Sequence, residues 1–350
     1  MQNLIFIGHD NIGDAFLTYN IIDTISYYEP NIKVFVYNKN SNKTEIFLKN
    51  HPNIKYSKAV STKILSLRIF KNTFTLYKDI LQILKTADVY ITSLLGSGTL
   101  GFVLKPLLIW NKLFGKNKII ILHLKPLFDT VPIHQHLTKF HFQKFSDVLN
   151  KEIKEQSSHP LTLNLRKKQQ EKTVVILPGA TKLWKVLPSE KFAQIASFFI
   201  KKGFKVKLLG SNSKIDTIQA EKIMQILNGN AKIANYVGKT SLLEYFEELY
   251  NAEYVITNDS SAQHIAYYFG VPCAVIWGRW NQSQTVKAYS WQSEKILNIF
   301  NEPYIFNNHK DGIGRLKNLI ALNLQAISVE RIINLMEKHL KITGKEERIR

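Results

Sequence analysis

The sequence predicts an α/β protein with two doubly wound parallel sheets. Short apolar runs alternate with segments of helical length along the whole chain, and this alternation is typical of parallel sheets with helices on both faces. One polar and basic segment, from Ile153 to Gln170, interrupts the alternation and contains Pro160, which indicates a linker. At 350 residues the chain is long enough for two domains. We place them at residues 1–160 and 171–350.

The first half contains five expected strands, each a short run rich in β-branched or aromatic residues. These strands are Leu4–Ile7, Lys33–Tyr37, Ile54–Tyr56, Val89–Thr92 and Lys118–Leu124. Helices are expected at Asp14–Tyr28, Glu45–Lys49, Thr73–Lys85, Phe102–Phe114 and His136–Leu149. Pro30 follows the first of these helices, and proline is common just beyond a helix end.

The alternation restarts after the linker. Strands are expected at Thr173–Leu177, Lys205–Leu209, Ile233–Tyr236, Val255–Thr257 and Ala274–Trp277. Helices are expected at Glu190–Lys202, Asp216–Leu227, Leu242–Tyr250, Ala262–Phe269 and Ser328–Leu340. Gly270 and Pro272 mark the end of the fourth helix. In such sheets ligands bind at the carboxyl ends of the strands.

The stretch from Val255 to Gly278 is the most informative part of the chain. Asn258, Asp259, Ser260 and Ser261 follow a buried strand and precede a helix, and these residue types favour helix capping. A helix start after a strand also suits a phosphate, because it presents free N–H groups and a positive dipole end. Capping alone and phosphate binding both remain open from these residues by themselves.

Composition restricts the partners without choosing one. The net charge of +20 is spread over both halves of the chain, which suits an anionic partner such as a lipid surface, a nucleic acid or a nucleotide. The one cysteine, Cys273, excludes an internal disulfide and fits a reducing compartment. We expect no signal peptide, because Leu4–Ile7 is too short, and no membrane-spanning run.

Two glycine motifs resemble nucleotide loops but lack a required residue. Gly96-Ser-Gly98-Thr-Leu-Gly101 matches G-x-G-x-x-G, yet the strand that follows ends at Lys125 with no acid to hold a ribose. Gly238-Lys239-Thr240 resembles the end of a P-loop, but Ile233 stands where that loop needs glycine. We therefore interpret both as turns, and an oxidoreductase or epimerase that depends on NAD(P) or another nucleotide remains the alternative interpretation.

Candidate site residues occupy the first turn of each half. Asp14 follows Gly13 at the start of the first helix, where an acid either stabilises the helix dipole or acts as a general base. Pro178-Gly179-Ala-Thr181 occupies the equivalent turn of the second half, and Lys182 and Lys185 follow it. Lysines here are either solvated or offset charge on a leaving diphosphate. His264 lies one helical turn beyond Asp259, and no Cys/His/Asp cluster has the spacing of metal ligands.

Taken together, these segments resemble glycosyltransferase family 9, the lipopolysaccharide heptosyltransferases of GT-B fold. The resemblance rests on these segments in family order: Ile12-Gly13-Asp14 with Thr18, Pro178–Thr181, Lys185-Val-Leu-Pro188-Ser-Glu190-Lys-Phe192, Leu209-Gly210, Val237-Gly-Lys-Thr-Ser-Leu242, Asn258-Asp-Ser-Ser-Ala-Gln-His264, Gly270-Val-Pro272 and Trp277-Gly278. This chain has Leu187 where the family has tryptophan, and Ser261 where it has glycine.

The resemblance implies two Rossmann-like domains facing a central cleft, residues 1–160 binding the acceptor and 171–350 the nucleotide sugar. It implies an inverting, metal-independent transfer without a cofactor, with ADP-heptose as donor or another nucleotide sugar as the alternative. The acceptor would be a lipopolysaccharide core or a lipid-linked saccharide. The enzyme would then contact the cytoplasmic face of the bacterial inner membrane and no nucleic acid.

The resemblance also implies roles for individual residues. Asp14 would be the catalytic base, in a loop with Asn11 and Gly13, and Lys185 would assist the leaving group. The donor would be held by Gly179, Thr181, Lys182, Asp259, Ser260, Ser261 and His264. Whether Lys182 or Lys185 is the main phosphate contact stays open at this point.

Overall fold

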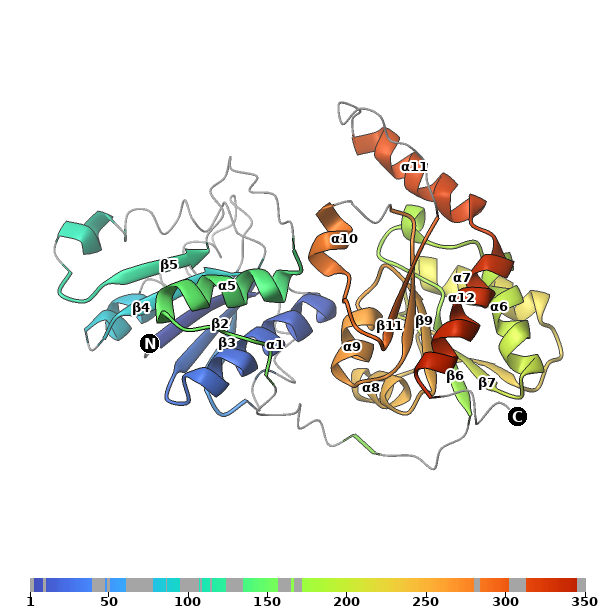
Figure 1. Cartoon of the computed structure of the whole chain (residues 1–350), viewed down its shortest axis with the longest axis horizontal. Coiled ribbons are helices and arrows are strands. Elements are labelled where there is room, and N and C mark those ends of the chain that lie inside the picture. The colour runs from blue at the N-terminus through green and yellow to red at the C-terminus, as the bar shows by residue number, and fades with distance from the viewer. Residues whose placement is uncertain are drawn as a thin grey trace. The chain divides into compact units, whose positions relative to one another are not determined.

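The chain forms two compact units, Met1–Leu163 and Asn164–Arg350, as seen in a computed structural model (Figure 1). The boundary falls inside the polar segment Ile153–Gln170. The structure describes residues 3–8, 11–39, 48, 51–60, 78–85, 87–94, 107, 109–113, 115–123, 135–156, 165–166, 172–279, 284–301 and 313–344. The predicted glycine turn Gly96–Gly101 lies outside these residues.

The N-terminal unit contains a parallel sheet of five described strands in the order β3-β2-β1-β4-β5. The strands are β1 (Asn3–Gly8), β2 (Lys33–Lys39), β3 (Ile54–Val60), β4 (Val89–Ser93) and β5 (Ile119–His123). The order reverses between β1 and β4, as in a Rossmann fold. Helices α1 (Ile12–Tyr28) and α5 (Leu137–Leu149) pack against each other (Figure 1). Described residues between 78 and 84 and between 107 and 113 are also helical.

Helix α1 is enclosed on nearly all sides, since every residue from Gly13 to Ser26 is buried. Its polar side chains therefore need partners. Asn20 Nδ2 donates to Glu155 Oε1 at 2.7 Å, and Thr24 Oγ1 donates to the Gln156 carbonyl at 3.0 Å. The expectation of a linker from Ile153 onward was therefore wrong for its first residues, because residues 153–156 pack against α1.

The C-terminal unit contains a parallel sheet of six described strands in the order β11-β10-β9-β6-β7-β8. The strands are β6 (Thr173–Leu177), β7 (Lys205–Leu208), β8 (Ile233–Asn235), β9 (Tyr254–Asn258), β10 (Cys273–Trp277) and β11 (Ile296–Phe300). The direction of progression reverses between β6 and β9. Both sheets thus confirm the prediction of two doubly wound parallel sheets.

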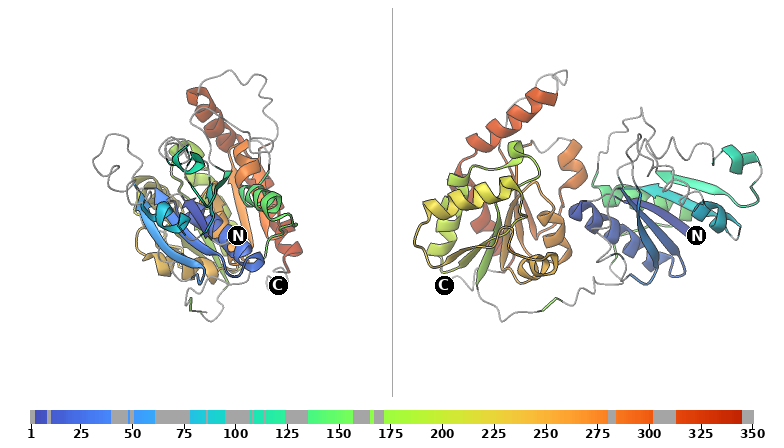
Figure 2. Two further views of the ribbon diagram at one scale, coloured as in Figure 1. Left: turned by 90° about the vertical axis from the view of Figure 1, so that its left-hand side faces the viewer. Right: turned by 180° about the vertical axis from the view of Figure 1, so that it is seen from behind.

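Helices cover both faces of this second sheet (Figures 1 and 2). They are α6 (Ser189–Lys201), α7 (Lys214–Ile226), α8 (Leu242–Tyr250), α9 (Ala262–Tyr268), α10 (Gln284–Tyr289), α11 (Ile313–Ala326) and α12 (Val329–Ile342), with one 3₁₀ turn η1 (Leu183–Lys185). Side chains of α6 and α12, including Phe192, Phe199 and Met336, share one core cluster with the strands. Each large side chain buried there contributes about 1.5–3 kcal/mol.

Three elements, α10, β11 and α11, were not predicted from the sequence. Strand β11 has the sequence ILNIF, so Asn298 interrupts a short apolar run and hides the strand pattern. The structure explains this residue, because Trp277 Nε1 donates to Asn298 Oδ1 at 2.9 Å. The other glycine motif, at Gly238, is a turn in which the Gly238 N–H donates to the Gly210 carbonyl.

Candidate active site

The loops that follow β6 and β9 are joined by the buried side chain of Asn258. Its Nδ2 donates to the carbonyls of Pro178 and Gly179 at 3.0 and 3.1 Å, and its Oδ1 accepts from the Leu187 N–H at 3.0 Å. A buried amide with all these bonds satisfied fixes the loops that it joins. Asn258 was predicted as a possible helix cap, whereas its side chain holds the Pro178–Thr181 turn in place.

Gly179 is required at this turn because a carboxylate lies directly behind it. A Cβ on Gly179 would overlap Asp216 of α7. The Asp216 Oδ2 atom accepts from the N–H and the hydroxyl of Ser211, both at 2.7 Å. These bonds order the segment after β7, and Asp216 in it lies against Gly179 in the loop after β6. The sequence offered only a weak signal for Asp216, an acid in the first turn of α7.

Lys185 and Asp259 form an ion pair across the point where the strand order reverses. The Nζ atom of Lys185 lies 2.6 Å from Oδ2 of Asp259, and the two side chains keep 21% and 14% of their surface exposed. Lys185 comes from η1 after β6, and Asp259 follows β9. Ligands of open parallel sheets bind at such a reversal point, beyond the carboxyl ends of the strands.

Arg279 adds a second cation next to this pair. Its guanidinium carbon lies 5.8 Å from the centre of a Trp184 ring, and Lys185 Nζ lies 5.6 Å from the centre of a ring of the same residue. Burial lowers the pKa of Arg279, and the negative charge of Asp259 acts in the opposite direction. Arg279 was not predicted as a site residue, although a basic residue at the carboxyl end of β10 was an available signal.

The remaining predicted donor residues differ in their surroundings. Thr181 and Lys182 are exposed on the turn that precedes η1. The Ser260 hydroxyl is 2.7 Å from Thr257 Oγ1 and accepts from the Ala262 N–H at 3.2 Å. Ser261 is the N-cap of α9 but makes no capping bond with its side chain. Ser260, not Asn258 or Asp259, therefore supplies the local helix-start contact.

His264 lies behind the helix start and is packed among aromatic rings. Its Nδ1 accepts a hydrogen bond from Trp291 Nε1 at 3.0 Å, and Tyr289 also contacts its ring. Burial lowers the pKa of His264 to about 3. The imidazole is therefore neutral near pH 7, and the accepting Nδ1 leaves the proton on Nε2.

In the N-terminal unit, Asp14 lies at the reversal point between β1 and β4. It is 7% exposed and occupies the first turn of α1, which directly follows β1. Asn11 Nδ2 donates to Asp14 Oδ2 at 3.0 Å, and Gly13 beside it is buried. A carboxylate in the first turn is stabilised by the helix dipole, so the fold holds this acid at the carboxyl edge of its sheet.

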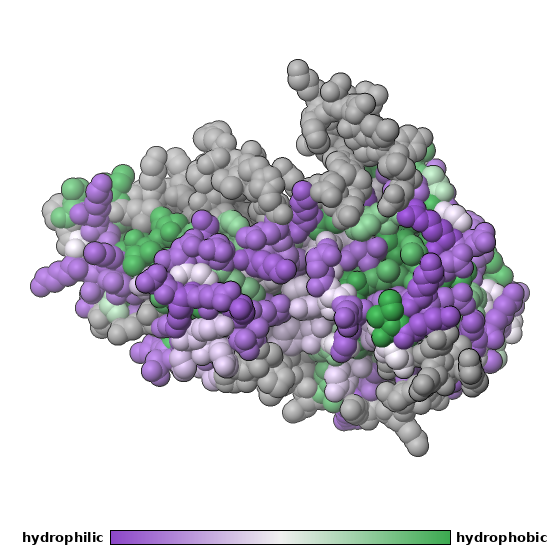
Figure 3. Space-filling view, in the orientation of Figure 1, coloured by the Kyte–Doolittle hydropathy of each residue, from purple (hydrophilic) through white to green (hydrophobic). Residues whose placement is uncertain are grey.

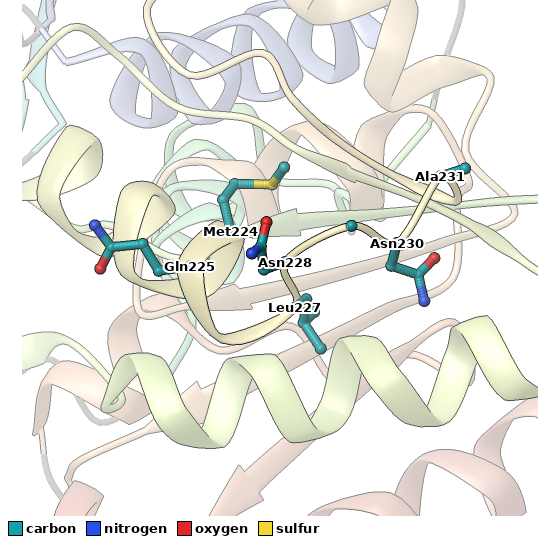
Figure 4. Close-up of a pocket in the computed structure, with 7 residues that line it drawn as sticks. Met224, Gln225, Leu227, Asn228, Asn230 and Ala231 are labelled. Atoms are coloured by element: carbon teal, nitrogen blue, oxygen red, sulfur yellow. The ribbon is translucent and has the colours of Figure 1, made fainter.

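Other features of the described residues offer less chemistry. No group of three or more His, Cys, Asp or Glu residues is placed to hold a metal within the described ranges. A pocket at the end of α7 is lined by Met224, Gln225, Leu227, Asn228, Gly229, Asn230 and Ala231 (Figure 4). None of these side chains is ionisable, and the pocket lies between α7 and the start of β8, at the amino edge of the sheet.

Comparison with known families gives a match that includes the C-terminal part of this site. The family "Glycosyltransferase family 9 (heptosyltransferase)" matches residues 123–310. A stretch of 102 residues is 33% identical to lipooligosaccharide heptosyltransferase 2 of Haemophilus influenzae. This stretch covers 29% of the chain and 28% of that relative, so the chain aligns with less than a third of the relative's length.

Solved structures resemble the chain over nearly its full length. Heptosyltransferase WaaC of E. coli, solved with ADP, gives a TM-score of 0.67 at 14% identity, covering 97% of this chain and 100% of that one. A glycosyltransferase family 9 protein of Veillonella parvula gives 0.67 at 16% identity, covering 97% of both chains. ADP-heptose lipopolysaccharide heptosyltransferase II of E. coli gives 0.65 at 15% identity, covering 99% and 100%. At these identities the likeness establishes the fold.

Proposed function

The chain belongs to glycosyltransferase family 9, and from this premise we propose that it transfers a sugar from a nucleotide sugar to a saccharide hydroxyl. The proposed transfer inverts the anomeric centre and uses no metal. ADP-heptose is the proposed donor, and a lipopolysaccharide core or lipid-linked saccharide is the proposed acceptor. Solved relatives with ADP and with an ADP-heptose analogue support this choice of donor.

The Lys185–Asp259 ion pair is the observation that carries the proposal. In a transfer of this kind the bond between the anomeric carbon and the diphosphate oxygen breaks, and negative charge builds on the leaving diphosphate. Preorganised positive charge at that position lowers the barrier. Lys185 is held in place by Asp259, whereas Lys182 is exposed, so we assign the main phosphate contact to Lys185. Asp259 would then contact the donor sugar.

Asp14 is the proposed general base. A saccharide hydroxyl is a weak nucleophile at neutral pH, and it must lose its proton as the new glycosidic bond forms. The Asn11 amide holds one carboxylate oxygen of Asp14 by a 3.0 Å hydrogen bond. The burial of α1 fixes the backbone that carries Asp14. A carboxylate that is already ordered loses less conformational entropy when the substrate binds.

A lipid-linked acceptor requires contact with a membrane, and the N-terminal unit offers a surface for it. Ile109, Trp110 and Leu113 are 56%, 48% and 67% exposed on the helical segment 107–113, and Lys112 beside them is exposed. Hydrophobic side chains reach the surface near this teal helix (Figures 1 and 3). Apolar and lysine side chains together favour an anionic bilayer surface.

We propose that this surface rests on the cytoplasmic face of the inner membrane. None of the helices in the described ranges has the length and hydropathy needed to cross a bilayer. The proposed contact is therefore peripheral, made by the side chains of segment 107–113 and the lysines around it.

A thermal-shift screen tests the proposed donor. A ligand at about one hundred times its Kd stabilises the folded state by about 2.7 kcal/mol, so the correct ADP-, UDP-, GDP- or CMP-sugar is expected to raise Tm by several degrees. A transfer assay with that sugar and a lipopolysaccharide core acceptor then tests the reaction. Stabilisation by NAD(P)H alone, with no transfer, would instead favour the oxidoreductase reading.

A further inference from the structure

Two cations contact the indole of Trp184, and one of them is ion-paired. Lys185 is ion-paired with Asp259 at 2.6 Å, so this pair has no net charge. Arg279 lies over the same tryptophan. Among the described residues, Asp259 is the one carboxylate that acts on either cation. The cluster of Lys185, Arg279 and Asp259 therefore carries one net positive charge.

The strand end that carries Arg279 is firmly held. Trp277 Nε1 donates to Asn298 Oδ1 at 2.9 Å, and the Gly278 carbonyl accepts from Asn323 Nδ2 at 3.1 Å. A Cβ on Gly278 would collide with Ile320 of α11, so only glycine allows α11 to approach this closely. The backbone immediately before Arg279 is thus fixed between β11 and α11.

The guanidinium of Arg279 is partly removed from water, and the described residues do not replace all of its lost hydrogen bonds. Its Nε atom is buried and has no hydrogen-bond partner there. Removing a charged group from water costs free energy unless a charge or hydrogen bonds replace the water. The cation–π contact with Trp184 offsets only part of this cost. An oxyanion would satisfy both the unpaired Nε–H and the net charge.

We propose that Arg279 is a second anion-binding residue, and that its guanidinium binds a phosphate oxygen of the diphosphate in the donor. This inference deepens the proposed function and rests on it for the identity of the anion. Guanidinium N–H groups match the geometry of phosphate oxygens and can bind two at once. Trp184 orients the guanidinium, and Arg279 adds a net positive charge beside the Lys185–Asp259 pair.

Isothermal titration with inorganic pyrophosphate tests the inference without a choice of nucleotide. Arg279→Gln is expected to weaken pyrophosphate binding by about tenfold to a hundredfold, as for a lost hydrogen bond to a charged group. Arg331→Gln in α12 is the matched control, since it removes the same charge from the same unit outside this cluster, and its Kd is expected to equal that of the wild type. Arg279→Lys keeps one charge and is expected to restore part of the affinity.

The outcomes separate the inference from the proposed function. Equal pyrophosphate affinity for Arg279→Gln and wild type, or no binding by the wild type, would overturn the inference even if the protein transfers sugar. Weak binding by Arg279→Gln and Arg279→Lys alike, with Tm lowered in both, would assign Arg279 a structural role and also overturn it. Pyrophosphate binding through Arg279 in a protein that transfers no sugar would keep the inference and remove the proposed function.

Discussion

Lys185 Nζ lies 2.6 Å from Asp259 Oδ2, and this contact joins the loop after β6 to the loop after β9. The two residues are 74 positions apart in sequence. They meet because β6 and β9 are neighbouring parallel strands whose carboxyl ends lie at the same edge of the sheet. The pair provides an organised charge at the place where parallel α/β sheets bind ligands.

Lys185→Gln is expected to lower kcat for sugar transfer by about 10²–10³, because it removes a cation positioned for the leaving diphosphate. Lys182→Gln is the matched control from the same loop. It is expected to lower kcat by less than about tenfold, because Lys182 is exposed and a solvated charge contributes little. Steady-state transfer kinetics at saturating donor would check both, and equal losses would contradict the assignment of Lys185.

Asp259→Asn is expected to separate nucleotide binding from transfer. The substitution keeps the size of the side chain but frees Lys185 from its counter-charge, so ADP is expected to bind as tightly as before or several-fold tighter. Transfer is expected to fall by about 10² or more, since the contact to the donor sugar is lost. Calorimetry with ADP and a transfer assay would measure the two effects, and a parallel loss of both would argue against this division of roles.

Asp14→Asn is expected to reduce kcat by about 10²–10⁴, the usual contribution of a general base. Donor affinity should stay unchanged, because the amide preserves the shape of the side chain and lies in the other unit from Lys185. Asn11→Ala removes only the hydrogen bond to Asp14, and a loss of about tenfold is expected. Undiminished transfer by Asp14→Asn would reject it as the base.

His264 is expected to make the C-terminal unit less stable in mild acid. Burial depresses its folded pKa to about 3, below the ordinary value of 6.5, so between these values the unfolded chain binds a proton that the folded chain does not. Stability therefore falls as pH drops below about 6.5, by about 2 kcal/mol at pH 5 for this group. His264→Asn, which keeps an acceptor near Trp291, should lose this part of the pH dependence in denaturant unfolding. An unchanged pH dependence would show that burial of His264 is not its source.

Trp110→Glu is expected to weaken binding to vesicles of phosphatidylglycerol and phosphatidylethanolamine by at least about tenfold, because it replaces an apolar contact by a charge that anionic lipid repels. Tyr27→Glu is a matched control, since Tyr27 is an exposed aromatic residue of the same unit, on α1. Cosedimentation would measure both. Equal effects of the two substitutions would mean that segment 107–113 is not the contact surface.

The sequence was sufficient for most of the secondary structure. Strands β6 and β10, for example, are short apolar runs bounded by turn residues, and burial on both faces of a parallel strand produces this pattern. It was insufficient for β11 because Asn298 interrupts the apolar pattern by which a strand is predicted. The structure accommodates this polar residue because its side chain accepts a hydrogen bond from Trp277. The start of the expected linker was also misplaced, because the partners of Glu155 and Gln156 are more than 130 residues away on α1.

The sequence by itself determined the predicted site residues Asp14, Lys185 and Asp259 and the turns that carry them. Local patterns suffice for this, since an acid or a lysine after a buried strand is visible along the chain. Only the tertiary structure decided the pairing of Lys185 with Asp259, the bridging role of Asn258 and the approach of Arg279 to Trp184. These contacts join residues that are distant in sequence. They are brought together by the order of the strands in the sheet, and no local sequence pattern predicts that order.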